Sequence, residues 1–152
     1  MLLMRGPTSN DKALIKTWIC GMIGGNDRDN VASSEVEKYF SNPDYSLHIA
    51  EQDSKAIGFG VVKSDPFEGS DSVCELGLFQ IDSTHQGKGA GTFLFQSIEA
   101  QLRSSGTRKL YTKTNPANLR AVHFWLSRGF EFEARLLKLN GDIDYYLLSK
   151  TL

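Results

Sequence analysis

The chain has 152 residues, of which 40% are hydrophobic, and its formal net charge is −1. This length predicts a single domain, residues 1–152, with enough apolar surface to bury a core. The near-neutral charge argues against a nucleic-acid partner, because binding to phosphates requires a basic face. No apolar run is long enough to cross a membrane and the first five residues are too short for a signal peptide, so we expect a cytoplasmic protein with no membrane partner.

The only two cysteines, Cys20 and Cys74, lie in apolar periodic segments. This placement predicts reduced thiols in the core rather than a disulfide or a metal site. His48 and His85 have no companions at metal-ligand spacing, so no metal is expected.

The first helix is predicted from a capping box. Thr8 and Asp11 have the spacing at which a hydroxyl and a carboxylate satisfy the first free amides of a helix. The apolar pattern that follows predicts a helix through Cys20, with Leu14 and Trp18 facing inward.

The next segment is rich in glycine and polar residues. Residues 21–30 are expected to end the first helix and to form a loop that does not pack. Ser34 and Glu37 form a second capping box, which predicts that a short second helix starts there. Asn42-Pro43 ends this helix, because the residue before a proline avoids helical backbone angles.

The remaining elements follow from alternating apolar patterns and turn residues. The expected strands are residues 1–5, 45–51, 55–63, 73–81, 109–114, 130–138 and 143–150. Helices are expected to begin near Ala90 and Asn118 and to close at Gly106 and Gly129, and Asn140-Gly141 predicts a hairpin turn. The order β-α-α-β-β-β-α-β-α-β-β predicts an α/β (α+β) fold, in which helices cover both faces of a mixed sheet.

The strand 73–81 leads into three glycines at alternate positions, Gly87, Gly89 and Gly91. Glycine lets the backbone approach a ligand closely, and the free amides of the following helix N-terminus attract anions. The stretch therefore predicts a phosphate cradle, with a plain glycine-rich connector as the alternative.

Two better-known phosphate loops do not fit this stretch. A P-loop requires a hydroxyl residue after its lysine, but Lys88 is followed by Gly89. The dinucleotide fingerprint requires a glycine where this chain has Thr92.

The segment Gln86–Gly91 resembles the pyrophosphate loop Gln/Arg-x-x-Gly-x-Gly/Ala of the GNAT superfamily of N-acetyltransferases. Ile81-Asp82 is similar to the Val-Asp-Pro lead-in of that family, although Ser83 replaces the proline. A second segment, Asn118–Phe130, resembles the family pattern Asn-x-x-Ala-x-x-Phe-Tyr-x-x-x-Gly-Phe. The order of elements is similar to the GNAT fold along the whole chain.

The resemblance implies acetyl-CoA as co-substrate and assigns a set of residues to it. The cofactor-binding residues that it implies are Phe79 and Ile81, through their backbone, then Gln86, Gly87, Lys88, Gly89, Ala90, Gly91 and Thr92, and finally Asn115, Asn118 and Phe124. The side chains of Phe79 and Ile81 could equally be ordinary core. The two asparagines have an alternative role as turn and N-cap residues, and Leu119, Val122 and Leu126 are expected on one face of the helix that follows.

Glu75 is the candidate catalytic residue. In the resemblance it occupies the position of the general-base glutamate found in some GNAT enzymes, eleven residues before Gln86. A carboxylate near the amine, directly or through one water, can take its proton. The alternative is a solvated or ion-paired strand residue.

The chain departs from the family pattern at Trp125. The family often has tyrosine there, as the acid that protonates the departing thiolate, whereas an indole N–H donates no proton at neutral pH. His123, Tyr145 and Tyr146 are substitutes between which the sequence does not decide. A coenzyme A thiolate can also leave unprotonated, because thiols ionise near pH 8–9.

These observations predict an N-acetyltransferase that moves acetyl from acetyl-CoA to a primary amine by direct attack in a ternary complex. The alternative is a non-catalytic acyl-CoA binding or sensing module, and an ATP-binding protein is the weakest reading. The acceptor, a small molecule or a peptide amine, is not specified by the sequence, and neither is a homodimeric state.

Overall fold

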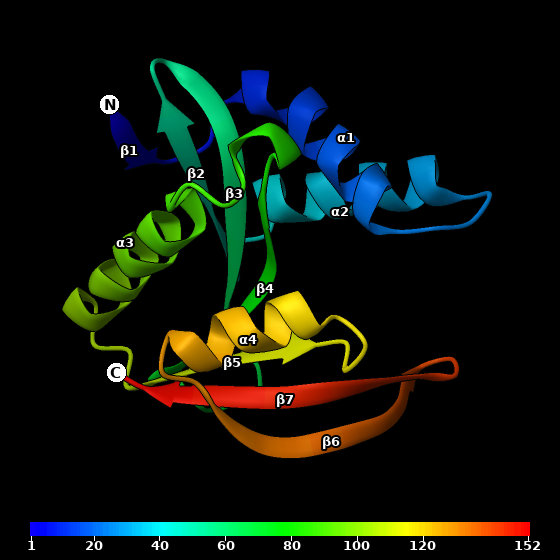
Figure 1. Ribbon diagram of the computed structural model, residues 1–152, viewed down its shortest axis with the longest axis vertical. Coiled ribbons are helices and arrows are strands. Elements are labelled where there is room, and N and C mark those ends of the chain that lie inside the picture. Colours follow the sequence, from blue (N-terminus) through cyan, green and yellow to red (C-terminus); the bar gives the residue numbers. More distant parts are fainter. The chain divides into compact units, whose positions relative to one another are not determined.

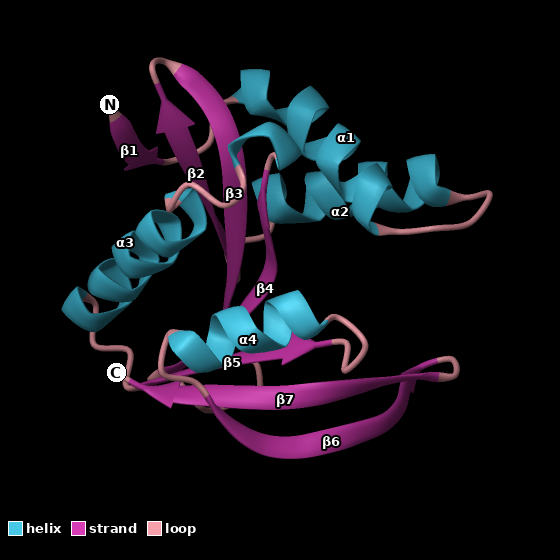
Figure 2. Cartoon of the chain, viewed as in Figure 1, coloured by secondary structure: helices cyan, strands magenta, loops and turns pink.

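The computed structural model describes all of residues 1–152 (Figures 1 and 2). The strands are β1 (Leu2–Arg5), β2 (Tyr45–Gln52), β3 (Lys55–Ser64), β4 (Val73–Ile81), β5 (Lys109–Thr114), β6 (Glu131–Asn140) and β7 (Ile143–Thr151), and the helices are α1 (Lys12–Met22), α2 (Arg28–Ser41), α3 (Ala90–Ser104) and α4 (Leu119–Ser127). The strand order in the sheet is β1-β2-β3-β4-β5-β7-β6. β4 pairs with β5 in parallel, whereas β1–β2, β5–β7 and β6–β7 are antiparallel. The predicted mixed α/β fold is confirmed.

The chain forms two compact units that share β4 and α3. The first unit consists of residues Met1–Val62 and Leu78–Ile98, and the second of Lys63–Gly77 and Glu99–Leu152. The first half of β4 therefore belongs to the second unit and its last four residues to the first. No helix is long and apolar enough to cross a membrane.

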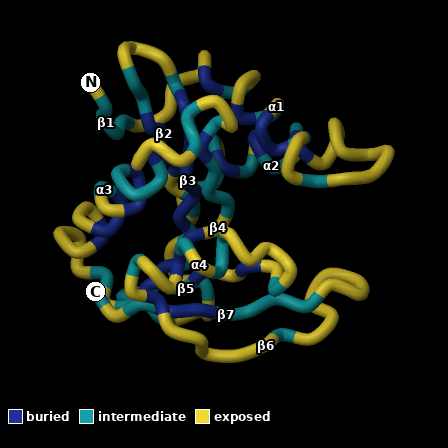
Figure 3. Tube along the Cα trace, viewed as in Figure 1, coloured by how far each residue is buried: buried dark blue, intermediate teal, exposed yellow.

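The core of the first unit lies where α1 and α2 pack on β2 and β3 (Figure 3). Ile15, Trp18 and Ile19 are buried at helical spacing, and the Trp18 ring stacks on Phe59 at 5.7 Å between centroids. Trp18 faces inward as predicted. Leu14 does not: its side chain is 38% exposed, because the face that docks on the sheet begins one residue later, at Ile15.

The predicted loop 21–30 and the predicted start of the second helix are wrong. α1 continues through Gly21 to Met22 and α2 already begins at Arg28, so that Ser34 and Glu37 lie inside α2. A helix needs only one apolar face, and Ala32, Val36 and Tyr39 supply it here. The polar residues before Ala32 occupy its solvent side, and Asp29 in the first turn suits the positive end of the helix dipole.

The first capping box is confirmed and has a second function. Asp11 accepts hydrogen bonds from the Thr8 amide at 2.7 Å and from the Arg5 guanidinium at 2.8 and 2.9 Å. Arg5 also pairs with Glu51 on β2. The Arg5 guanidinium is the largest cause that lowers the pKa of the Asp11 carboxyl.

In the second unit, Trp125 is the buried residue of α4, where it is 5% exposed. Leu119 and Leu126, which the sequence pattern places on one face, are 74% and 40% exposed. The end of α4 explains why Trp125 is buried instead. The Phe130 amide donates to the Trp125 carbonyl at 3.1 Å after Gly129, at φ +95°, and this turn brings the Phe130 ring against the Trp125 ring at 5.2 Å.

Gly106 closes α3 in the same manner, as predicted. Its φ is +88°, its amide donates to the Arg103 carbonyl at 3.1 Å, and the Thr107 amide donates to the Leu102 carbonyl at 3.0 Å. Leu94, Phe95, Ile98 and Leu102 are all buried and form the apolar face of this helix.

Candidate functional site

The predicted cradle lies in the first unit, between the end of β4 and the start of α3. Gly87 has φ +74° and Gly89 has φ +87°, a region that residues with a Cβ rarely adopt. No heavy atom lies within 4 Å of the place where a Cβ on either glycine would be. The two glycines therefore give the loop its path and leave the space in front of it open.

Backbone amides face this open loop at the first turn of α3. The first intrahelical bond runs from the Phe93 amide to the Gly89 carbonyl at 3.0 Å. The amides of Ala90 and Gly91 precede that bond, so no carbonyl of the helix is available to them. Together with the positive end of the helix dipole, they make a site for an anion.

The approach to the cradle is held by hydrogen bonds on both sides. The Asp82 amide donates to the Ile57 carbonyl on β3 at 2.7 Å, and the Gln86 side-chain amide donates to the Ile81 carbonyl at 2.7 Å. Thr84 Oγ1 donates to Asp82 at 2.9 Å, which is the largest cause that lowers the pKa of the Asp82 carboxyl.

Gly58 is a site residue that the sequence reasoning missed. A Cβ at Gly58 would lie 2.5 Å from Ile81 Cδ1 and 2.6 Å from the Gln80 carbonyl oxygen. Glycine thus lets β3 approach the last residues of β4. The sequence signal for this close approach was a glycine inside a strand pattern. The neighbouring Gln80 also received no role from the sequence, and its Oε1 is buried without a hydrogen-bond partner.

Glu75 lies in the second unit, on the first half of β4. Its Cα partner on β5 is Tyr111, and its carboxylate Oε1 lies 3.2 Å from the ammonium of Lys113. The Glu75 side chain is 18% exposed. The ion pair that the sequence offered as the alternative to a base is therefore present, and it does not exclude the other role.

Asn115 and Asn118 both have the turn roles that the sequence allowed. Asn115 Oδ1 accepts from the Ala117 amide at 2.9 Å, and Asn118 Oδ1 accepts from the Ala121 amide at 3.1 Å as the N-cap of α4. A carboxamide NH₂ group remains on each side chain as a donor. Phe124 is half-buried, with its ring 4.8 Å from that of Trp125 and 5.0 Å from the Arg128 guanidinium.

The three candidate substitutes for the missing acid are all in the second unit. His123 is exposed and lies 3.4 Å from the Ser127 hydroxyl. Tyr146 has its ring 5.0 Å from that of Phe132 and 5.9 Å from the Arg135 guanidinium, and Tyr145 is the Cα partner of Leu136. Trp125 itself belongs to the core. Its presence in place of tyrosine therefore has a packing reason.

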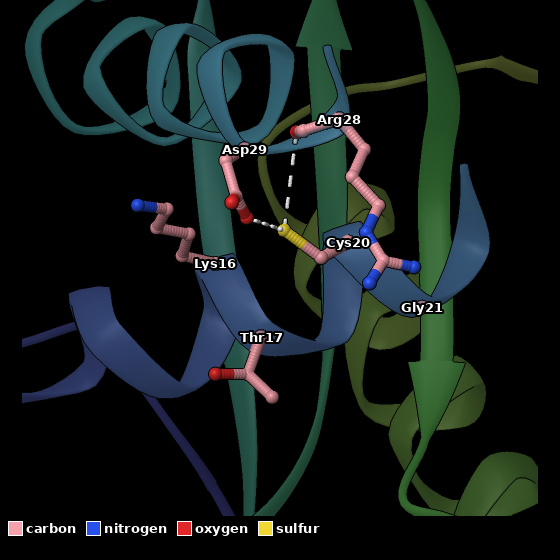
Figure 4. A pocket seen from close by; sticks show the side chains of 6 residues that line it. All are labelled: Lys16, Thr17, Cys20, Gly21, Arg28 and Asp29. Atoms are coloured by element: carbon pink, nitrogen blue, oxygen red, sulfur yellow. Dashed lines mark hydrogen bonds between the residues drawn. The ribbon is translucent and has the colours of Figure 1, made fainter. Parts of the chain in front are cut away.

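A pocket of about 510 Å³ opens between α1 and α2 in the first unit (Figure 4). It is lined by Lys16, Thr17, Cys20, Gly21, Arg28 and Asp29, none of which the sequence reasoning assigned to a site. Cys20 Sγ lies 3.3 Å from Asp29 Oδ1, and burial together with this carboxylate raises the pKa of the thiol. Both cysteines are free, but Cys20 is only half-buried and borders this pocket.

The structure thus gathers the predicted residues in two places. Phe79, Ile81 and Gln86–Thr92 lie together in the first unit, and Glu75, Asn115, Asn118 and Phe124 lie in the second. β4 carries residues of both groups. No cluster of three or more His, Cys, Asp or Glu side chains able to hold a metal ion is present.

A mixed seven-stranded sheet whose strand β4 runs through an open glycine loop into α3 defines an α/β protein, and a glycine loop before a helix N-terminus is typical of anion-binding sites. The sequence model of the acetyltransferase (GNAT) family matches residues 14–130. The chain belongs to this family and is a coenzyme A-dependent acetyltransferase. The resemblance and the enzyme class predicted from the sequence are confirmed.

Several known proteins resemble the chain. The uncharacterized protein YdhI of Bacillus subtilis is 23% identical over an alignment of 120 residues that covers 68% of this chain and 74% of YdhI. A GNAT-family protein from Desulfovibrio desulfuricans has a TM-score of 0.84 at 18% identity, with 99% of both chains covered. An aminoglycoside 6′-N-acetyltransferase complexed with coenzyme A has a TM-score of 0.79 at 18% identity, covering 98% of this chain and 96% of that one. At these identities the structures establish the fold.

Proposed function

We propose that the protein transfers an acetyl group from acetyl-CoA to a primary amine by direct attack in a ternary complex. The observation that carries this proposal is the open loop at Gly87 and Gly89, which leads directly into the first turn of α3. A coenzyme A pyrophosphate fits this loop, because backbone amides and a helix N-terminus are the groups that bind phosphates. Lys88 adds a cation beside the loop, where its ammonium now donates to the Thr84 carbonyl at 3.3 Å.

The last residues of β4 provide donors for the thioester oxygen. Successive N–H groups of a strand point to opposite edges. Because the Asp82 amide donates to β3, the amides of Phe79 and Ile81 point away from β3. We assign these two amides to the thioester oxygen, where donors aimed at developing negative charge accelerate acyl transfer. The NH₂ groups of Asn115 and Asn118 are assigned to the amides of the pantetheine arm, and the Phe124 ring to contact with that arm.

Glu75 is assigned as the general base. An alkylamine with a pKa of about 10.4 is charged at pH 7, and removing its proton costs roughly 4–5 kcal/mol. Glu75 accepts that proton, and the freed amine nitrogen then bonds to the acetyl carbon. The carbon–sulfur bond breaks and coenzyme A leaves as its thiolate, while the second proton, which the nitrogen loses as the amide forms, passes to water. Lys113 Nζ lies 3.2 Å from Glu75 Oε1, and we assign the second carboxylate oxygen to the amine.

An acceptor screen read by release of free coenzyme A tests the activity. Acceptor-dependent release is expected, and binding of coenzyme A without any release would favour the non-catalytic sensing module. A cytoplasmic location stays a prediction.

The cradle is tested separately by calorimetry with coenzyme A. Gly89→Asp places a negative charge against the pyrophosphate and is expected to weaken binding at least about tenfold. Gly141→Asp is the matched control, because Gly141 also has a positive φ, +62°, and open space around it, in the β6–β7 turn. Wild-type affinity in Gly89→Asp would show that the cradle is assigned to the wrong loop.

A further inference from the structure

The loop between β3 and β4, which belongs to the second unit, carries an exposed aromatic ring. Phe67 is 53% exposed. Its ring meets the Tyr111 ring on β5 edge-on, with 5.1 Å between centroids and 84° between planes. Phe67 is therefore held in a defined place and still offers ring surface to solvent.

The loop backbone is organised to present this ring. Asp65 accepts hydrogen bonds from the Gly69 amide at 3.0 Å and from the Ser70 amide at 2.7 Å, which close the loop around Phe67. Asp65 has φ +49° and Glu68 φ +45°, two left-handed residues that are not glycine. Such backbone costs free energy and persists where the surrounding bonds impose it.

Phe67 shares a sheet face with the proposed base. Tyr111, which Phe67 contacts, is the Cα partner of Glu75 on the neighbouring parallel strand, so that both side chains point to the same face. The contact between Glu75 and Lys113, two residues beyond Tyr111, confirms this orientation. The Lys109 ammonium already lies 4.9 Å from the centre of the Tyr111 ring. Of the two rings, Phe67 is therefore the one that can contact a further cation.

The charges of this loop are all negative. Residues 64–72 contain Asp65, Glu68 and Asp71 and no lysine or arginine. The lysines of the neighbouring strand are already neutralised, because Lys109 pairs with Glu133 at 2.7 Å and Lys113 pairs with Glu75 at 3.2 Å. A cation above Phe67 would gain from the ring face and from the carboxylates of the loop.

From this arrangement we propose that the acceptor is a diamine. Its reacting nitrogen lies at Glu75, and its second nitrogen stays protonated over the Phe67 ring, beside Glu68 and Asp71. The inference rests on the proposed acetyl transfer and adds to it the class of acceptor. The Phe67 loop then selects a second positive charge at a fixed distance from the reacting amine.

Binding is measured by calorimetry with the full chain in the presence of coenzyme A, using cadaverine and, as the matched monoamine, pentylamine. Cadaverine is expected to bind about five- to thirtyfold more tightly, the range of a cation–π contact with partial desolvation. Phe67→Ala should remove most of this preference and leave pentylamine binding unchanged. Phe132→Ala is the control, because Phe132 is 54% exposed and also meets a tyrosine ring edge-on, at Tyr146.

A double variant, Glu68→Gln with Asp71→Asn, tests the charges while it keeps the size of both side chains. It should reduce the preference for cadaverine, and Glu131→Gln on the exposed start of β6 should not. Equal binding of the two amines, or a preference that survives Phe67→Ala, overturns the proposal. Tighter binding of phenethylamine than of cadaverine also overturns it, because the loop would then prefer an aromatic group in the ligand to a second positive charge.

Turnover separates this inference from the proposed function. Phe67-dependent cadaverine binding together with release of coenzyme A supports both. Phe67-dependent binding without any release contradicts the acetyl transfer and leaves the diamine site standing. Release with many monoamines, but with no preference for cadaverine, supports the acetyl transfer and contradicts the diamine site.

Discussion

The loop between β4 and α3 and the sheet face around Glu75 present different chemical groups, backbone amides in the first case and side chains in the second. The loop offers backbone amides. Gly87 and Gly89 contribute by having no side chain, which leaves the space in front of the loop open. At the sheet face, the groups offered are side chains, and each has a partner on another strand or loop, as Glu75 has Lys113 and Tyr111 has Phe67. A backbone site is determined by a few consecutive residues, whereas a side-chain site requires the pairing of distant strands.

The largest effect is expected at the sheet face. Glu75→Gln keeps the shape of the side chain but removes its ability to accept a proton, and turnover at pH 7 should fall about 10²–10⁴-fold. The loss should shrink as alkaline buffer deprotonates the amine, and coenzyme A affinity should barely change. Steady-state rates across pH check this, with Glu131→Gln as the control. A near-normal rate at pH 7 would remove Glu75 from the mechanism.

The second effect tests whether β3 supports the backbone site. Gly58→Val would place methyl groups where even a Cβ meets Ile81 and the Gln80 carbonyl at 2.5 and 2.6 Å. Because one of these contacts is backbone, the strands must move apart, at a cost of about 1–3 kcal/mol in the free energy of unfolding. Urea denaturation measures this cost. Gly21→Ala, which meets no atom within 4 Å, should leave the stability unchanged or raised.

Trp125→Tyr separates packing from catalysis. The smaller ring leaves space next to Phe130 and should cost about 1 kcal/mol of stability, the usual size for a core substitution. Turnover should stay the same or rise, because tyrosine restores the acid of the family pattern. Thermal unfolding and rates are measured on the same preparation. A large fall in turnover with the fold intact would give the indole a role in the site.

The smallest expected effect is a pH dependence of the free energy of unfolding, caused by His48 in the first unit. Burial lowers the pKa of His48 below its ordinary 6.5, and Ser46 Oγ lies 3.1 Å from its Nε2. The unfolded chain therefore binds the proton more tightly, so stability is fully present above the unfolded pKa and falls as the pH drops through the folded one. Urea midpoints between pH 7.5 and about pH 5 should decrease, and His48→Gln should flatten this change. Asp11, whose pKa is lowered from 3.8, acts only at lower pH.

Most secondary structure and the glycine loop between β4 and α3 could be predicted because they depend on neighbours in the sequence. The glycine loop, the capping box at Thr8 and Asp11, and the closing turns at Gly106 and Gly129 are decided within about five residues, which a single sequence displays. The order of helices and strands along the chain followed from the same local signals.

The tertiary structure decided which faces are buried and which side chains meet. Ile15 instead of Leu14 faces the sheet, and Trp125 instead of Leu119 faces the core, because packing against another element selects among several apolar residues on one helix. The contacts of Glu75 with Lys113 and of Phe67 with Tyr111 join residues about 40 positions apart along the chain. No local pattern encodes such pairs, because strand register determines which side chains become neighbours.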